Sequence, residues 1–153
     1  MEWLKEFEAG HEQLDLEHRV MFDLINQFQE KIKQGVPLED LELVLKKIRQ
    51  FAEHHFEWEE KIMTEIGFPD AETHQALHKM LLASLKDMIQ EISFGSLPSE
   101  SMLQYLVNWF TMHTSHEDQE MVAYLGVQEA SGMLPPGAAA LVGKNRAEGK
   151  LAH

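Results

Sequence analysis

The residues with the clearest capacity for chemistry are a histidine and a glutamate in the middle of an apolar helical stripe. His55 and Glu59 are four residues apart, so on an α-helix they point to the same side. The same stripe is otherwise apolar on both sides of them: Leu41, Val44, Ile48, Phe51, Ile62, Met63 and Ile66. Burying an unpaired polar group costs roughly 2–7 kcal/mol on transfer scales. His55 and Glu59 therefore need polar partners from elsewhere in the chain.

Helical periodicity divides the chain into four long segments. They begin near Leu14 and end near Leu125, and three breaks separate them, at Gly35–Pro37, Gly67–Pro69 and Gly95–Pro98. Strand signals are absent and the connections are short. The pattern predicts an all-α protein, an up-down-up-down four-helix bundle.

Segments at both ends lie outside the predicted bundle. Residues 1–13 predict an N-terminal arm, with Trp3 and Phe7 as its anchors on the body. Residues 127–153 are rich in Gly, Ala and Pro, which predicts a C-terminal extension that is mobile or packed on the surface. We expect one domain over residues 1–126, the arm included.

Composition limits the classes of partner. A formal net charge of −13 argues against nucleic acid or an anionic membrane surface. The chain has no cysteine, which excludes disulfides, thiolate metal sites and cysteine nucleophiles. No apolar run approaches the roughly 18 residues of a membrane span, and the first residues lack a signal-peptide core. We therefore expect a cytoplasmic protein.

Antiparallel packing predicts that every helix brings a histidine to the same level. The first break is centred near residue 36, and His18 and His55 lie 18 and 19 residues from it. The third break is centred near residue 96, and His78 and His113 lie 18 and 17 residues from it. About the break near residue 68, Glu59 lies nine residues before and His78 ten after. At about 1.5 Å of rise per residue, these mismatches amount to a few ångströms. His74 is one helical turn from His78.

Histidines and carboxylates gathered in an apolar core are typical of a buried metal site. Five histidines exceed the ligands of a closed zinc site, and no HExxH motif is present. Two metal ions that share bridging carboxylates fit the count better. The ExxH motifs of ferritin-like di-iron enzymes are missing from the predicted interior, since Glu8-x-x-His11 lies in the arm. A histidine-rich set carries less negative charge, which favours ferrous iron and reversible binding of dioxygen.

These motifs resemble those of the hemerythrin family, specifically its bacterial single-domain members. The resemblance covers nearly all of residues 1–125, and four segments carry it: Leu14-Asp15-x-Glu17-His18, His55-Phe56-x-x-Glu59-Glu60, His74-x-x-x-His78 and Trp109-x-x-x-His113-x-x-x-x-Asp118. It implies a non-haem di-iron centre with an oxo or hydroxo bridge. By resemblance, one iron is held by His74, His78 and His113, and the other by His18 and His55. Glu59 and Asp118 would bridge the two.

The resemblance implies reversible dioxygen binding, for oxygen storage, transport or scavenging. Dioxygen would bind at an open position of the second iron, in a binding protein rather than an enzyme, with no catalytic residue. The same centre leaves open a peroxide- or nitric-oxide-consuming enzyme, an oxygen or redox sensor module, and simple iron storage. We expect Trp109, Phe110 and Thr114 to line the dioxygen pocket. The family often has an aliphatic residue at the place of Thr114, whose hydroxyl could admit water or donate a hydrogen bond to a bound ligand.

The spacing of His113 and Asp118 is awkward, because five residues turn an ideal helix by about 140° past a full turn. A π-type widening would bring both to one side. Glu117 stands at the more regular spacing of four and remains a competitor, although the resemblance favours Asp118.

We assign no metal-ligand role to the other polar residues. We expect His116 to face outward or sideways, His54, Glu57 and Glu60 to lie on the solvent side or behind the ligands, and His11 and His153 to have no evident role.

Overall fold

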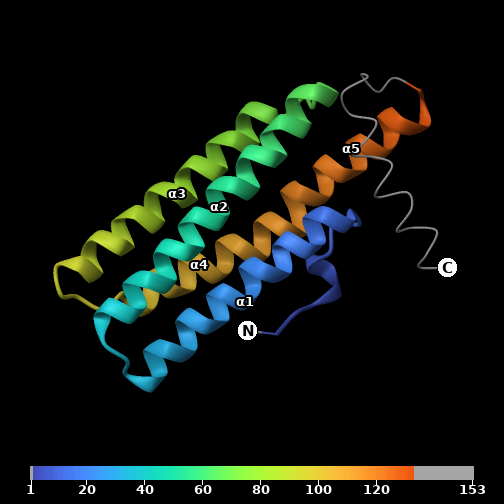
Figure 1. The fold of residues 1–153 in the computed structure, drawn as a ribbon. Helices are drawn as coiled ribbons and strands as arrows, with labels where there is room; N and C mark the ends of the chain where they lie inside the picture. The colour runs from blue at the N-terminus through green and yellow to red at the C-terminus, as the bar shows by residue number, and fades with distance from the viewer. Residues whose placement is uncertain (1, 133–153) are drawn as a thin grey trace.

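The computed structural model describes residues 2–132 as four antiparallel helical rods (Figure 1). The first three are α1 (Glu12–Gln34), α2 (Leu38–Ile66) and α3 (Ala71–Ser93). The fourth rod is continuous but has three parts, α4 (Glu100–Met112), the π-helical turn η2 (His113–Glu117) and α5 (Asp118–Ala130). The predicted all-α, up-down-up-down four-helix bundle is confirmed. Within residues 2–132, no helix is long and apolar enough to cross a membrane.

The ends of the helices follow from local backbone chemistry. α1 begins two residues before its predicted start because the side chain of His11 caps it, accepting a hydrogen bond from the backbone N–H of Leu14 at 3.4 Å. α1 and α2 end at Gly35 and Gly67, with φ of 68° and 66°. This left-handed conformation favours glycine and leads the chain into the tight turns between rods.

The N-terminal arm lies along the bundle and contains the short helix η1 (Lys5–Phe7) (Figure 1). Trp3 and Phe7 pack edge-to-face on Phe22 and Phe110, with ring centroids 5.5 and 6.1 Å apart. Phe110 also lies near the polar residues described below, so the arm covers one side of the rods that carry them.

The core consists of two apolar clusters with a polar layer between them. The larger cluster includes Phe28, Leu45, Ile48 and Leu85, and the smaller one includes Leu14, Ile62, Met63, Phe68, Met121 and Leu125. Along α1, α2 and the fourth rod, buried histidines and carboxylates fall between the residues of one cluster and those of the other.

The fourth rod continues beyond its predicted end. α5 runs to Ala130 rather than to Leu125, so the first residues of the predicted extension are helical. Residues 133–153, which make up most of that extension and include His153, lie outside the described residues. The boundary at residue 126 stays a prediction.

Candidate metal centre

Seven buried polar side chains from all four rods meet at one level of the bundle. They are His18, His55, Glu59, His74, His78, His113 and Asp118, and none is more than 3% exposed. These are the seven residues that the sequence places together, and the antiparallel register accounts for their common height.

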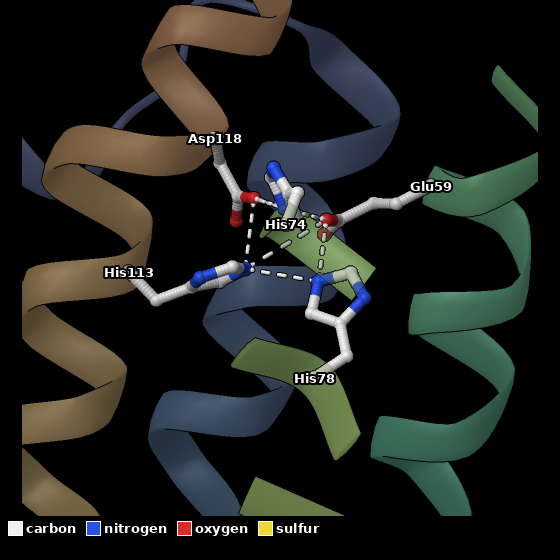
Figure 2. Close-up of side chains that lie close together, drawn as sticks. All are labelled: Glu59, His74, His78, His113 and Asp118. Carbon is white, nitrogen blue, oxygen red and sulfur yellow. Dashed lines mark hydrogen bonds and ion pairs between the residues drawn. The ribbon is translucent and has the colours of Figure 1, made fainter. Parts of the chain in front are cut away.

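The two oxygens of Glu59 face two different groups of histidines. Oε1 lies 3.0 Å from Nε2 of His74 and 3.2 Å from Nε2 of His78 (Figure 2). Oε2 faces the other way and contacts Nε2 of His55. Glu59 therefore stands between the groups rather than inside one of them.

Asp118 divides its oxygens in the same way. Oδ1 lies 3.0 Å from Nε2 of both His74 and His113, whereas Oδ2 lies 2.8 Å from Nε2 of His18. The donor atoms thus form two sets that share both carboxylates, one with His74, His78 and His113 and one with His18 and His55. Within each set, the donor atoms lie within 4.8 Å of one another. A carboxylate that offers one oxygen to each of two neighbouring sets has the geometry of a bridging ligand.

The π-helical turn η2 puts His113 and Asp118 on the same side of the fourth rod. The backbone N–H of Asp118 donates to the carbonyl of His113, five residues earlier, as a π-turn requires. Asp118 is fully buried in the cluster (Figure 2). Glu117 lies on the outer side of the His113 ring, where its Oε1 is 3.8 Å from Nδ1. The helix is therefore widened between His113 and Asp118, the pair whose spacing led us to expect a π-type turn.

The donor set fits a metal ion. Several inward atoms are buried and, despite their short contacts with one another, make no hydrogen bond of regular geometry among the described residues: Nε2 of His18 and His55, Oε2 of Glu59, and both carboxylate oxygens of Asp118. Buried polar atoms without such a bond are rare in folded proteins. Nε2 of His78 also faces Nε2 of His113 at 3.1 Å, so two lone pairs oppose each other when both neutral rings carry their proton on Nδ1. A cation among these atoms would bind the lone pairs and neutralise the carboxylates.

Without a metal ion, the histidines must balance the negative charge of the buried carboxylates. Burial alone would lower the pKa of His55, but the negative charge of Glu59 and the hydrogen bond that His55 donates to Glu17 outweigh it and raise the pKa to about 10. Burial is likewise outweighed at His74, where the close carboxylates of Asp118 and Glu59 raise the pKa to about 9. Burial would raise the pKa of Glu59, yet the charge of His55 holds it well below its usual range. The carboxylates are therefore ionised and the histidines compete for protons.

Aromatic rings hold two of the histidines in place. Phe56 stacks on His78 with a centroid distance of 3.8 Å and an interplanar angle of 5°. Trp109 stacks on His113 at 4.3 Å and 22°. Because each ring is fixed from its face, its rotation about the side-chain bonds is restricted and Nε2 stays directed inward.

A small cavity of about 20 Å³ adjoins the cluster. The expected pocket residues Trp109, Phe110 and Thr114 line it, together with these: His18, Met21, Ile25, His55, Phe56, Leu81, Leu106 and His113. The hydroxyl of Thr114 donates to the backbone carbonyl of Phe110 at 2.9 Å, so its single proton is used within the helix. The expected hydrogen bond from Thr114 to a bound ligand would require that bond to break.

The structure also assigns places to the remaining polar residues. His54, Glu57 and His116 are exposed, as expected. His11, for which the sequence indicates no role, is 1% exposed and caps α1. Glu17 stands in the sequence only as part of a motif, yet Nδ1 of His55 donates to it at 2.7 Å. No spacing rule within one helix reveals this contact, because Glu17 lies on α1 and His55 on α2.

The fold and the site together define a class of protein. It is a four-helix bundle with one buried layer of histidines and shared carboxylates. Residues 9–125 match the family model described as the hemerythrin HHE cation binding domain, so the chain belongs to the hemerythrin family. The resemblance stated from the motifs is thereby confirmed.

Individual relatives are distant but align over most of their length. A bacteriohemerythrin of Clostridium acetobutylicum is 27% identical over 125 residues, which are 78% of this chain and 97% of the relative. A bacteriohemerythrin of Campylobacter jejuni is 26% identical over 112 residues, 72% of this chain and 84% of the relative. A solved structure of a point mutant of hemerythrin has a TM-score of 0.75 at 22% identity, covering 82% of this chain and 96% of its own. Wild-type hemerythrin has a TM-score of 0.71, also at 22% identity, covering 78% and 92%.

The raised pKa values make metal binding depend on pH. At neutral pH the metal-free protein holds protons on His55 and His74, whereas a metal ligand must be a neutral imidazole. A divalent cation must displace these protons, so its apparent affinity should rise with pH up to about 9, by about tenfold per unit for each proton released. Calorimetry of Co²⁺ binding in buffers of different ionisation enthalpy measures the protons released. An affinity independent of pH between about 6 and 9 would contradict this assignment.

Proposed function

We propose that this protein holds two iron ions and binds dioxygen reversibly, in oxygen storage, transport or scavenging in the cytoplasm. One observation carries the proposal: two donor sets share both of their carboxylates directly beside a small apolar cavity. The names of the bacteriohemerythrin relatives support it.

The two donor sets offer different numbers of ligands. We assign His74, His78 and His113 to one iron, His18 and His55 to the other, and Glu59 and Asp118 as bridges with an oxo or hydroxo group. The second set has one histidine fewer, so an ion held there would have one protein ligand fewer. Both histidines of that set, His18 and His55, line the cavity, whereas the other set contributes His113 alone to its lining, so a small molecule in the cavity would lie beside the second ion. When bound, the irons would supply the electrons and the attachment point for dioxygen.

The cavity favours a diatomic molecule over a larger substrate. A volume of about 20 Å³ is close to that of a single water-sized probe. Its lining is mainly apolar, and the hydroxyl of Thr114 is engaged with the backbone, so a water molecule would find few partners there. A neutral diatomic molecule needs no such partners. The side chains of this pocket therefore exclude water and select by size.

A spectroscopic experiment tests the proposed function. The iron-loaded protein is reduced without oxygen, air is admitted, and the visible spectrum is recorded. We expect a charge-transfer band that develops with oxygen, fades under vacuum and returns when oxygen is readmitted. Direct and irreversible oxidation with no such band would reject the carrier and favour the enzymatic or iron-storage alternatives.

Replacing Glu59 tests the bridging assignment. Glu59→Ala should lose most of the bound iron, because this carboxylate belongs to both donor sets. Iron content per chain, measured on the purified protein, checks the result. Glu57→Ala is the matched control, since Glu57 is an exposed carboxylate on the same helix. Two irons per chain in Glu59→Ala would contradict the assignment.

Two replacements of Thr114 separate its hydroxyl from its volume. Valine has nearly the same shape without the hydroxyl, whereas isoleucine adds a methylene group to the wall of the cavity. Since the hydroxyl already bonds to the backbone, we expect Thr114→Val to autoxidise like the wild type and Thr114→Ile to autoxidise more slowly. Stopped-flow decay of the oxygenated form measures both rates. Equally slowed decay in the two variants would show that the hydroxyl itself admits water.

A further inference from the structure

Two glutamates outside the cluster hold the outer nitrogens of two of its histidines. Nδ1 of His55 donates to Oε1 of Glu17 at 2.7 Å, and Nδ1 of His78 donates to Oε2 of Glu60 at 3.0 Å. The glutamate side chains are 18% and 32% exposed, so both lie at the edge of the bundle. The opposite nitrogens of the same two rings, Nε2, face Glu59.

Both contacts join neighbouring helices. Glu17 reaches from α1 to the histidine on α2, and Glu60 reaches from α2 to the histidine on α3. Gln13 donates a hydrogen bond to the second oxygen of Glu17 and so helps to fix that side chain. In a neutral imidazole, a proton held on Nδ1 by a carboxylate leaves the lone pair on Nε2, directed into the cluster. The ring nitrogen that would bind a metal is therefore set by a residue on the preceding helix.

Each donor set receives one of these hydrogen-bonded carboxylates. His55 belongs to the set with His18, and His78 belongs to the set with His74 and His113. The outer nitrogens, Nδ1, of His18 and His113 have no such hydrogen bond to a carboxylate. Nδ1 of His18 is buried and makes no hydrogen bond among the described residues, and Nδ1 of His113 lies 3.8 Å from Glu117, too far for one.

We propose that Glu17 and Glu60 are positioning residues, one for each metal ion, which orient their histidines and make the imidazoles stronger donors. The proposal rests on the two-iron assignment given above. A negative charge behind a ligand stabilises the ion with the higher positive charge. Glu17 and Glu60 therefore tighten metal binding and lower the midpoint potential of the iron centre. Glu117 contributes charge without a hydrogen bond, and its effect is smaller.

Glutamine variants test the proposal on the full chain. Glu17→Gln and Glu60→Gln keep an oxygen that accepts the hydrogen bond but remove the charge. Co²⁺ affinity is measured by competition with a chelator. We expect each variant to weaken one of two binding steps by roughly 10- to 100-fold, and the double variant to weaken both. Glu117→Gln should lose less, and Glu57→Gln, an exposed change of equal charge on α2, should match the wild type.

The midpoint potential distinguishes positioning from a merely structural role. In the iron-loaded protein, both variants should have a more positive potential than Glu57→Gln, because the oxidised centre loses a nearby negative charge. Glu17→Ala and Glu60→Ala, which lose the hydrogen bond as well, should bind Co²⁺ more weakly still. Thermal unfolding of the metal-free variants checks that they are folded.

Two results would overturn the proposal. Affinities and potentials equal to those of Glu57→Gln would remove both roles of the glutamates. A second result is that the alanine variants bind Co²⁺ weakly while the glutamine variants bind it like the wild type. The glutamates would then only orient their histidines, and the effect of charge would be rejected. Failure of the proposed function is a separate outcome, since it would be seen in the wild type, which would then bind fewer than two metal ions or give no reversible band with oxygen.

Discussion

The structure depends on keeping two ionised carboxylates inside an apolar bundle. Glu59 and Asp118 are fully buried between two hydrophobic clusters, where an unpaired charge would be strongly destabilising. The described residues meet this demand with histidines: those on α1, α3 and η2 lie 2.8 to 3.2 Å from the carboxylate oxygens, and His55 on α2 contacts Glu59. Each rod must therefore present a histidine at one height, and this requirement fixes the register of the whole bundle.

The same constraint explains the irregular turn in the fourth rod. A regular α-helix would direct Asp118 about 140° away from His113 and leave its carboxylate outside the cluster. η2 inserts a wider turn in which the N–H of Asp118 still finds a carbonyl partner, that of His113. The backbone thus loses little hydrogen bonding, and the carboxylate gains His18, His74 and His113 as neighbours. The cost of an unusual helix is offset at the site that requires it.

The sequence predicted features that depend on regular geometry and missed those that depend on individual side chains. Helical rise and antiparallel packing were enough to bring His18, His55, His78 and His113 to one level, whereas the wider turn was expected only because the resemblance favoured Asp118 over Glu117. The contact of Glu17 with His55 depends on the rotamers of two residues on different helices, and sequence periodicity does not predict rotamers. The hydroxyl of Thr114 could point to the pocket or bond to the helix backbone, and in the folded protein it donates to the carbonyl of Phe110.

Placing charge behind the histidines solves a problem that placing it in the pocket would create. A carboxylate lining the cavity would hold water there, because an ionised group must keep polar partners. Glu17 and Glu60 lie instead at the edge of the bundle, where solvent already reaches them, and neither lines the cavity. Their negative charge is transmitted through the N–H of an imidazole to the nitrogen on its other side. On the proposed assignment, the chain can therefore adjust the donor strength of its ligands without admitting water to the place where a neutral diatomic molecule binds.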